Sequence, residues 1–420
     1  MKITLTQFRP NTAEGVWTDC FAQAIAELHK AGGGVLTVPT GEYSTGPIEL
    51  CSNMELHLEP GAVIRFLNDP AAFPLQECQY EGRISHRPKP CLSAFNAENV
   101  ALTGSGVLDG CGAPWWAAQR ARTLANGRPY LLHFENVTHL RVCGVQLRNS
   151  PAWTVHPLNC VDVLIEDVSI CNPYNSPNTD GINPESCRDV RILNCRVDVG
   201  DDCITLKSGT EETPSPVPCE NIVIANCLLV HGHGGIVIGS EMSGGVRNVT
   251  VTNCVFTGTD RGLRVKTRRR RGGCVENLRL SNLVMERVFC PFVFNMYYSC
   301  GTAEKDRWVW EKTPYPVDGG TPAFRNIRIN GVTVVGATAS AGFFYGLAES
   351  PIDGLSLTDC HIEMARGAAP EKPAMMGNLE PMSARGFFLR NAKNVEFHNV
   401  TLKNADGEAY DTDESVDGEF

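Results

Sequence analysis

The sequence predicts an all-β, single-domain parallel β-helix of about ten coils. Short segments of alternating apolar and polar residues recur along the chain, and three of them share one pattern ending in Asn-Cys, at 187–195, 219–227 and 246–254. Turn residues separate the segments, and the chain contains 40 glycines and 26 prolines. Asn recurs at matching turns, where it tolerates left-handed backbone and can form hydrogen-bonded ladders between coils. Together these features indicate a solenoid.

Four short polar clusters lie between these segments. They are Asn178-Thr-Asp-Gly181, Gly200-Asp-Asp202, Gly232-His-Gly234 and Arg264-Val-Lys266. The steps from Asp180 to Asp202, from there to His233 and from there to Arg264 are 22, 31 and 31 residues. If each step is one coil, the clusters stack on one face at strand spacing, about 4.8 Å apart. We therefore predict an active site built from distant parts of the sequence.

Length and charge narrow the class of protein. A chain of 420 residues is long for one domain, but solenoids grow in one dimension and escape that limit. The net charge of −10 argues against a nucleic-acid-binding protein, which needs a basic face. No apolar run approaches the roughly 18 residues of a membrane span, so we expect no membrane partner. The sequence does not predict the oligomeric state.

The cysteines and the N-terminal residues bear on location. Residues 1–8 lack the apolar region of a secretory signal. Eighteen cysteines occur, and Cys195, Cys227, Cys254 and Cys360 share one register of the repeat, where we expect them to pack inward as small apolar side chains. We therefore expect a reduced, cytoplasmic protein, or a secreted one if a leader has been removed.

The whole chain, 1–420, is expected to form one parallel β-helix domain. Its N-terminal part, 1–32, should contain a short helix with Phe21, Ile25 and Leu28 on one face. Such a helix would cap the first coil, whose strands would otherwise expose an unpaired edge.

Three further segments interrupt the repeat. Residues 68–95 and 300–322 are expected to be long loops that leave the solenoid. Residues 405–420 are acidic and contain few apolar side chains, so we expect a loose tail.

Three carboxylates on neighbouring coils suit glycoside hydrolysis, in which one acid protonates the leaving oxygen and one carboxylate activates water. Crowded carboxylates shift one another's pKa values apart, so that one can stay protonated near neutrality. His233 could tune that acid or bind substrate. Arg264 and Lys266 alternate along one strand and would place positive charge where a sugar carboxylate could lie. Each cluster alone could be an ordinary turn or a solvated strand face, but their common spacing favours a site.

Further residues are candidate substrate contacts. Arg268 and Arg271 belong to a run of four arginines, which is either a solvated charge run or part of an anionic-sugar site. His156 and Lys207 lie about one coil from the acidic clusters. The pair Trp115-Trp116 could be a sugar-stacking platform or a packed core pair. No cluster has the spacing of metal ligands.

At these clusters the chain resembles the polygalacturonases of glycoside hydrolase family 28. The similarity extends from Gly33-Gly34-Val35 through Gly104-Ser-Gly-Val-Leu-Asp-Gly110 to Gly346-Leu-Ala-Glu-Ser-Pro351, which is most of the chain. The resemblance implies a right-handed β-helix that cleaves α-1,4-linked galacturonic acid in pectin of the cell wall. It implies inversion, with no metal and no cofactor.

The resemblance also implies roles for single residues. Asp201 would be the general acid, and Asp180 and Asp202 would hold and activate the water. His233 would support the acid. The substrate carboxylate would be bound by Arg264 and Lys266, with Asn178 of the first cluster also counted among the substrate-binding residues.

An exo-acting enzyme, working from the non-reducing end, is the expected type. Tyr80-Glu-Gly82 within 68–95 resembles bacterial exo-type members, in which extra loops close one end of the groove, although the basic segment 83–89 departs from that pattern. Related substrates, rhamnogalacturonan or xylogalacturonan, stay open. Rival hypotheses are a calcium-dependent β-eliminating lyase and a non-catalytic solenoid that binds acidic glycans.

Overall fold

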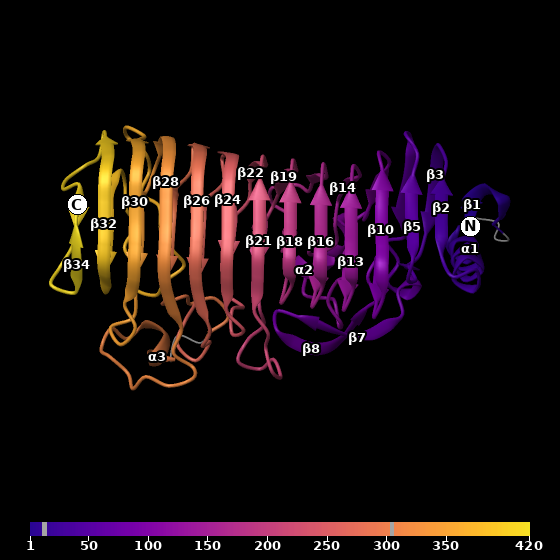
Figure 1. The fold of residues 1–420 in the computed structure, drawn as a ribbon, viewed down its shortest axis with the longest axis horizontal. Coiled ribbons are helices and arrows are strands. Elements are labelled where there is room, and N and C mark those ends of the chain that lie inside the picture. The colour runs from indigo at the N-terminus through magenta and orange to yellow at the C-terminus, as the bar shows by residue number, and fades with distance from the viewer. Residues whose placement is uncertain (11–14, 303–305) are drawn as a thin grey trace. The chain divides into compact units, whose positions relative to one another are not determined.

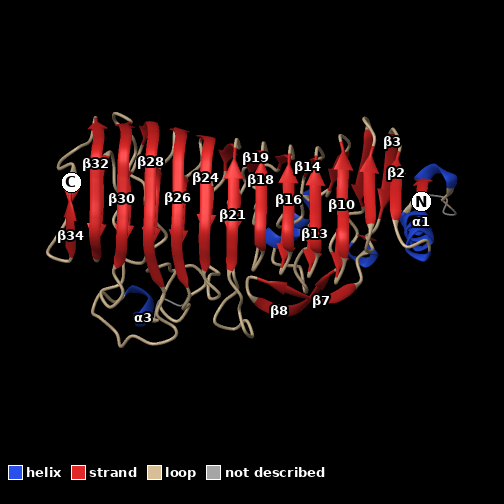
Figure 2. Cartoon of the chain, in the orientation of Figure 1, coloured by secondary structure: helices blue, strands red, loops and turns tan. Residues whose placement is uncertain are grey.

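The computed structural model describes residues 1–10, 15–302 and 306–420. Strands dominate these residues and helices are few (Figures 1 and 2). By its internal contacts the chain divides into two compact units, Met1–Asp201 and Asp202–Phe420. Among the described residues, none of the helices has the length and apolar character that crossing a membrane requires.

The first unit begins with a strand and a helix and continues as short strands. Its elements are β1 (Lys2–Thr4), η1 (Leu5–Gln7), α1 (Thr18–Lys30), β2 (Gly34–Val38), β3 (Gly41–Thr45), β4 (Ile48–Glu49), β5 (Met54–Leu58), β6 (Ala62–Phe66), η2 (Pro70–Ala72), β7 (Leu75–Tyr80), β8 (Arg83–Pro88), β9 (Leu92–Phe95), β10 (Glu98–Gly104), β11 (Val107–Asp109), α2 (Ala113–Arg120), β12 (Leu132–Glu135), β13 (Thr138–Cys143), β14 (Gln146–Arg148), β15 (Val155–Leu158), β16 (Val161–Glu166), β17 (Ser169–Cys171), β18 (Arg188–Leu193) and β19 (Arg196–Val199).

Strands of successive coils in this unit pair in parallel and in register. One stack runs β1, β2, β5, β10, β13, β16, β18, a second runs β3, β6, β11, β14, β17, β19, and a third runs β4, β9, β12, β15. Alternate side chains point inward, so the alternating sequence becomes a ladder of buried Leu, Ile and Val. This is the predicted parallel β-helix.

The predicted N-terminal cap is confirmed in α1. Phe21, Ile25 and Leu28 share its buried face, and β1 pairs with β2 beside the helix. The strand edge at the start of this unit is therefore occupied.

The second unit contains longer strands. Its elements are β20 (Ile204–Leu206), β21 (Cys219–Ala225), β22 (Leu228–His231), β23 (Ile236–Ile238), β24 (Val246–Thr257), β25 (Arg261–Lys266), β26 (Cys274–Glu286), β27 (Cys290–Asn295), α3 (Arg307–Trp310), β28 (Ala323–Ala337), β29 (Ser340–Tyr345), β30 (Ile352–Met364), β31 (Arg385–Arg390), β32 (Ala392–Lys403), β33 (Tyr410–Asp411) and β34 (Val416–Glu419).

Two parallel stacks make up this unit. One runs β21, β24, β26, β28, β30, β32, β34, with β22 also paired to β24, and the other runs β20, β23, β25, β27, β29, β31, β33. Cys227, Cys254 and Cys360 are buried in the first stack, as expected for inward-facing cysteines.

Asparagine ladders mark the turns, as predicted. Asn248 donates from Nδ2 to Asn221 Oδ1 at 3.0 Å, Asn277 donates to Asn248 at 3.0 Å, and Asn326 donates to Asn277 at 2.6 Å. All four have φ between 54° and 59°. Asn suits this turn because its short amide tolerates left-handed backbone and bonds to the next coil.

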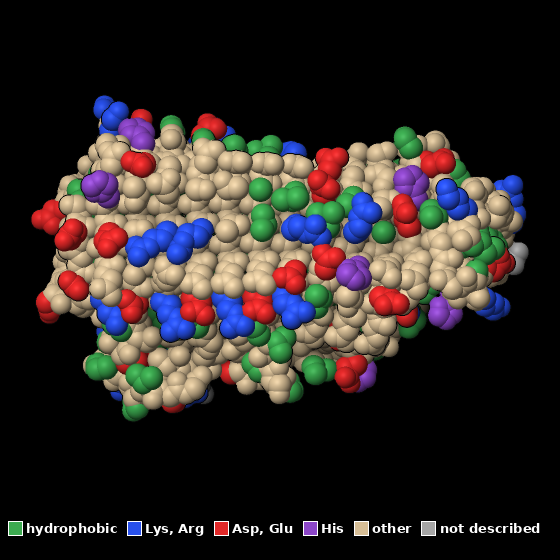
Figure 3. Space-filling model, viewed as in Figure 1, with side chains coloured by type: hydrophobic (Ala, Val, Ile, Leu, Met, Phe, Trp, Pro, Cys, Tyr) green, Lys and Arg blue, Asp and Glu red, His purple; other side chains and the backbone are tan. Residues whose placement is uncertain are grey.

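Charged side chains form a second ladder on the outer face of the first stack in this unit (Figure 3). In one register, acidic and basic residues alternate from strand to strand, in the order Glu220, Arg247, Glu276, Arg325, Asp353, Lys393. Ion pairs join Arg325 to Glu276 at 2.7 Å and Lys393 to Asp353 at 3.2 Å. Opposite charges alternate along this ladder, so the ladder itself offers no excess of positive charge to an acidic polymer.

The structure corrects two expectations. Residues 68–95 are not an irregular loop, because β7 and β8 form an antiparallel hairpin that turns at Glu81 and Gly82. The tail 405–420 is not loose: β33 and β34 extend the two stacks, and Phe420 packs on Tyr410 with ring centroids 4.9 Å apart.

The insertion predicted at 300–322 lies between β27 and β28 and contains α3. Its residues 303–305 lie outside the described residues. The single-domain interpretation stays a prediction.

Candidate active site

Asp180 lies in a tightly held turn of the first unit. The carboxylate is buried and accepts a hydrogen bond from Asn183 Nδ2 at 3.0 Å. The turn is clamped by Arg128, whose buried guanidinium donates to the backbone oxygens of Pro151 and Pro177 and to Asn178 Oδ1, the last at 2.7 Å. Asn178, predicted to bind substrate, therefore fixes the turn that carries Asp180.

Asp201 is brought to Asp180 within the same unit. A carboxylate oxygen of each lies within 4.8 Å of the other, and Asp201 is half-buried. The close approach depends on Gly200, where a Cβ would lie 2.5 Å from the backbone oxygen of Ser176. This separation is shorter than the 6.5–9.5 Å typical of the carboxyl pair in inverting glycosidases, so these two residues alone do not predict inversion.

Asp202 begins the second unit, one peptide bond after Asp201, and is almost completely buried. Its Oδ1 accepts from Arg264 Nη1 at 3.0 Å and its Oδ2 from Lys266 Nζ at 2.8 Å. Both cations lie on β25 and point to the same side, as predicted from their alternation. Burial raises the pKa of Asp202, but Lys266 and Arg264 outweigh burial and hold that pKa well below its usual range.

Tyr298 is a residue of this site that the sequence did not reveal. Its ring centroid is 5.3 Å from Lys266 Nζ and 5.9 Å from the Arg264 guanidinium carbon, and the ring is buried. Such contacts stabilise buried cations. It lies in the inserted segment after β27, outside the repeat, so no periodic pattern pointed to it.

His233 is half-exposed and faces a carboxylate. Its Nδ1 lies 2.8 Å from Asp260 Oδ2, which fixes the ring and leaves Nε2 as the nitrogen turned away from that partner. Asp260 was also missed, because a single Asp in a turn gives no signal of its own.

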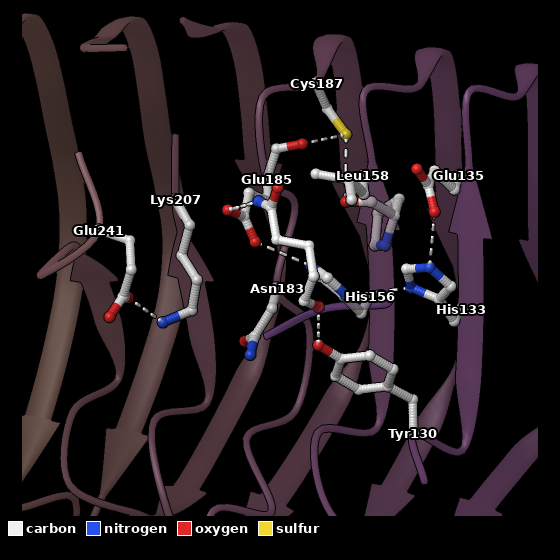
Figure 4. A network of polar contacts seen from close by, with 12 residues as sticks. Tyr130, His133, Glu135, His156, Leu158, Asn183, Glu185, Cys187, Lys207 and Glu241 are labelled. Atoms are coloured by element: carbon white, nitrogen blue, oxygen red, sulfur yellow. Dashed lines mark hydrogen bonds and ion pairs between the residues drawn. The ribbon is translucent and has the colours of Figure 1, made fainter. Parts of the chain in front are cut away.

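Lys207 is buried and paired. Its Nζ donates to Glu241 Oε2 at 2.8 Å (Figure 4). Burial raises the pKa of Glu241, but Lys207 and Arg271 together lower it to about 2. Lys207, a predicted substrate contact, is therefore one half of a buried ion pair.

The arginine run is neither a solvated charge run nor a free anion site. Arg268 and Arg271 are buried and share the carboxylate of Glu211 between them. Arg269 is buried against Glu349, which accepts from two of its nitrogens. Arg268 and Arg271 each still hold a buried Nε with no hydrogen-bond partner among the described residues.

His156 has no exposed surface and lies under the β7–β8 hairpin. Its Nε2 is 3.0 Å from Glu185 Oε2 (Figure 4). Its ring packs against Tyr130 and Trp153. The structure therefore gives His156 no surface for contact with a sugar.

The Trp115-Trp116 pair is core and not a platform. Both side chains are buried, Trp115 meets Phe73 edge to face at 5.8 Å, and Trp116 Nε1 donates to the Ser150 oxygen at 2.9 Å.

The first unit carries Asp180 and Asp201, which have carboxylate oxygens within 4.8 Å of each other. In the second unit, two cations beside an aromatic ring keep Asp202 ionised. Two consecutive aspartates in which one is fixed as a carboxylate suit general acid and base chemistry, because the other can then hold the proton.

The sequence and the structure are similar to those of known proteins of one family. The profile of glycosyl hydrolases family 28 matches residues 36–367. A probable polygalacturonase from Vitis vinifera is 30% identical over 363 residues, covering 84% of this chain and 72% of that protein. An endo-polygalacturonase from Pectobacterium carotovorum subsp. carotovorum is 30% identical over 272 residues, covering 61% of this chain and 65% of that protein.

Among solved structures, an exopolygalacturonase from Thermotoga maritima is 29% identical, with a TM-score of 0.76, and the match covers 96% of this chain and 92% of that one. This likeness confirms the predicted right-handed parallel β-helix. The profile match spans most of the sequence and includes all four polar clusters. The chain belongs to the glycosyl hydrolases family 28.

Proposed function

We propose that this chain hydrolyses α-1,4-linked galacturonic acid in pectin-derived oligosaccharides, with Asp201 as the general acid. The observation that carries the proposal is the ionised state of Asp202. Because Arg264 and Lys266 hold its pKa low, Asp202 cannot supply a proton near neutrality, whereas its neighbour Asp201 can. The names of the relatives, polygalacturonases from plants and bacteria, support the substrate class.

The reaction needs two proton movements. Asp201 gives its proton to the glycosidic oxygen as the bond from that oxygen to the anomeric carbon breaks. A water molecule forms the new bond to the anomeric carbon and loses a proton to the carboxylate of Asp180 or Asp202. Exchange with solvent then returns the proton to Asp201. His233, fixed by Asp260, supports the acid.

Buried positive charge in the second unit suits an acidic sugar. Five cations lie close to the carboxylates of Asp202, Glu211 and Glu241, namely Lys207, Arg264, Lys266, Arg268 and Arg271. Guanidinium and ammonium groups form strong hydrogen bonds with carboxylates, so these cations could also bind a galacturonate carboxylate. Rhamnogalacturonan and xylogalacturonan contain the same sugar and are the alternative substrates.

The exo mode is supported by the β7–β8 hairpin. The hairpin covers the face of β12 and β15 that carries His133 and His156, and both of those side chains are fully buried. Sugars cannot lie on a covered face, so the binding surface would end near Asp180 and admit only the end of a chain.

Location in the cytoplasm is part of the proposal. All eighteen cysteines lie in described residues and none of them forms a disulfide, which suits a reducing compartment. The protein would then trim imported oligosaccharides and not the intact cell wall. Immunoblots of fractionated native cells test this, and recovery of the protein in the medium contradicts it.

The test of the reaction is a product time course on defined galacturonic acid oligomers. We expect steady release of monomer from the non-reducing end, and a spread of sizes would contradict the exo mode. Proton NMR of the first product gives its anomeric configuration. We expect the β anomer from the α linkage, and an initial α anomer would overturn inversion.

The same samples separate hydrolysis from β-elimination. A lyase leaves an unsaturated uronide that absorbs in the ultraviolet and would lose activity on chelation of calcium. We expect neither result, and either one would overturn the proposed hydrolysis.

A further inference from the structure

Four ionisable side chains form a chain of polar contacts in the first unit, three of them buried and the fourth, Glu135, partly exposed (Figure 4). Glu135 Oε2 is 3.4 Å from His133 Nε2, the Nδ1 atoms of His133 and His156 are 3.1 Å apart, and His156 Nε2 is 3.0 Å from Glu185 Oε2. The side chains of His133, His156 and Glu185 have no exposed surface. The proposed reaction uses none of these four groups.

Counting protons shows that this chain carries charge. Each of the three contacts joins two atoms that can only accept unless a proton lies between them, so the chain needs three protons. With the carboxylates of Glu135 and Glu185 ionised, all three protons reside on the two histidine rings, which then share one positive charge. This charge gives the fully buried Glu185 the partner that a buried carboxylate requires.

The other donor to Glu185 comes from the hairpin. Gln79 Nε2 donates to Glu185 Oε1 at 2.6 Å, and the Gln79 backbone oxygen accepts from the Tyr130 hydroxyl at 2.6 Å. Next to it, Tyr80 stacks on Trp153 with ring centroids 4.8 Å apart. Apolar contacts also hold the hairpin, because Cys78 and Tyr80 pack on Tyr130 and Trp153. On the other strand, Arg87 Nη2 donates to the Arg128 backbone oxygen at 3.1 Å. Of these contacts, the one made by the Gln79 amide reaches a buried carboxylate.

We propose that Gln79 and Glu185 form a latch that keeps the hairpin closed over β12 and β15 and thereby sets where the sugar-binding surface ends. The inference deepens the proposed exo mode and rests on it for the effect on product length. Gln79 and Glu185 are positioning residues, since neither faces the reacting aspartates.

The polar half of the closure is specific, whereas the apolar half is not. An amide can donate to a carboxylate, but a second carboxylate at position 79 would face Glu185 with no proton between them. In a buried setting such an unpaired, like-charged contact strongly disfavours the closed hairpin. The packing of Cys78 and Tyr80 and the hydrogen bond of Arg87 would then compete with hydration of both carboxylates.

A cycle of two substitutions tests the latch. Gln79→Glu places two carboxylates together and should open the hairpin. Glu185→Gln should keep it closed, because the new amide accepts from Gln79 and donates to His156, whose ring can then be neutral. The double variant restores a complementary pair, with the carboxylate now at position 79 and the amide at position 185. Ser85→Glu, on the exposed face of the hairpin, adds the same charge without touching the latch.

Two measurements are made on each full-length variant. Hydrogen exchange of the backbone amides in 75–88 reports opening, and the size distribution of early products from long galacturonic acid oligomers reports where the binding surface ends. We expect Gln79→Glu to speed exchange and to raise the share of products longer than the monomer several-fold. Glu185→Gln, the double variant and Ser85→Glu should match the wild type in both.

Every other outcome contradicts a particular part of the proposal. Unchanged exchange in Gln79→Glu, or no recovery in the double variant, overturns the latch. Faster exchange with unaltered products overturns its role in product length. If the wild type itself releases a spread of sizes, the exo mode fails, while the exchange data still decide whether Gln79 and Glu185 hold the hairpin.

Discussion

At the scale of single residues, two consecutive aspartates are placed in different electrostatic surroundings. Asp202 is bound through both oxygens by Arg264 and Lys266, so it stays a carboxylate. Asp201 lies near the buried carboxylate of Asp180, and a neighbouring negative charge favours retention of a proton. This contrast supports the proposed role of Asp201 as the general acid.

Asp201→Asn should lower kcat by roughly 10²- to 10⁴-fold, which is the usual contribution of a general acid or base. The amide keeps the shape of the side chain, so we expect an unchanged melting temperature and little change in KM. Steady-state kinetics on galacturonic acid oligomers measure the loss. Asp167→Asn, at an exposed turn of the same unit, is the matched control and should keep full activity. An Asp201→Asn enzyme with near-normal kcat contradicts the assignment.

Single residues also show what could be predicted from the sequence and what could not. Because Arg264 and Lys266 are two residues apart, the sequence correctly predicted that they share one side of a strand. It could not show that both bind Asp202, because ion-pair partners 62 and 64 residues apart leave no local pattern. His156 was a candidate contact with sugar, and its burial by the hairpin follows from a segment outside the repeat.

At the scale of elements, the asparagine ladder joins successive coils and makes a testable contribution to stability. Asn277 donates to Asn248 and accepts from Asn326, and its φ is 58°. Asn277→Ala removes both bonds and leaves a residue with a Cβ in left-handed backbone. We expect a loss of about 3–4 kcal/mol in the free energy of unfolding, from two bonds of about 1 kcal/mol each and strain of about 1–2 kcal/mol. Urea unfolding measures it.

The matched variant Asn277→Gly removes the same two bonds without the strain. Its free energy of unfolding should therefore lie between those of the wild type and Asn277→Ala. If both variants unfold like the wild type, the ladder adds nothing to stability.

The elements that follow the repeat could be predicted from sequence, and those outside it could not. Alternating segments with Asn at the turns predicted the parallel strands, because each coil repeats the same pattern of strands and turns. The β7–β8 hairpin pairs antiparallel and buries Cys78 against Tyr130 and Trp153, which are distant in sequence. The acidic tail forms β33 and β34 because the preceding coil offers an open strand edge. Pairing with this edge outweighs the weak preference of the tail's own residues for strand conformation.

At the scale of the whole molecule, an acidic chain holds a cluster of buried cations. The net charge is −10, yet buried cations gather around Asp202, Glu241 and Glu211. The proposed binding of an acidic sugar would use these local cations, whatever the net charge. Because they lie in buried ion pairs, they also couple stability to pH.

Acid should destabilise the protein through these pairs. The pKa of Asp202 and that of Glu349 are lowered, and that of Glu241 falls to about 2. In unfolded chains Asp and Glu have pKa values of about 3.9 and 4.3. The stabilising contribution of each is thus fully present above that range and is lost as pH falls towards the folded value.

Scanning calorimetry should therefore show a melting temperature that holds from neutrality to about pH 5 and declines steeply from about pH 4 to pH 2, over the range set by these pKa values. Glu241→Gln is the diagnostic variant. At neutral pH it should be less stable by about 3–5 kcal/mol, because Lys207 loses its buried partner. Its decline in acid should be shallower, since one group with a lowered pKa is gone. A wild-type melting temperature that rises below pH 4, or an equally steep decline in Glu241→Gln, would show that these ion pairs do not govern acid stability.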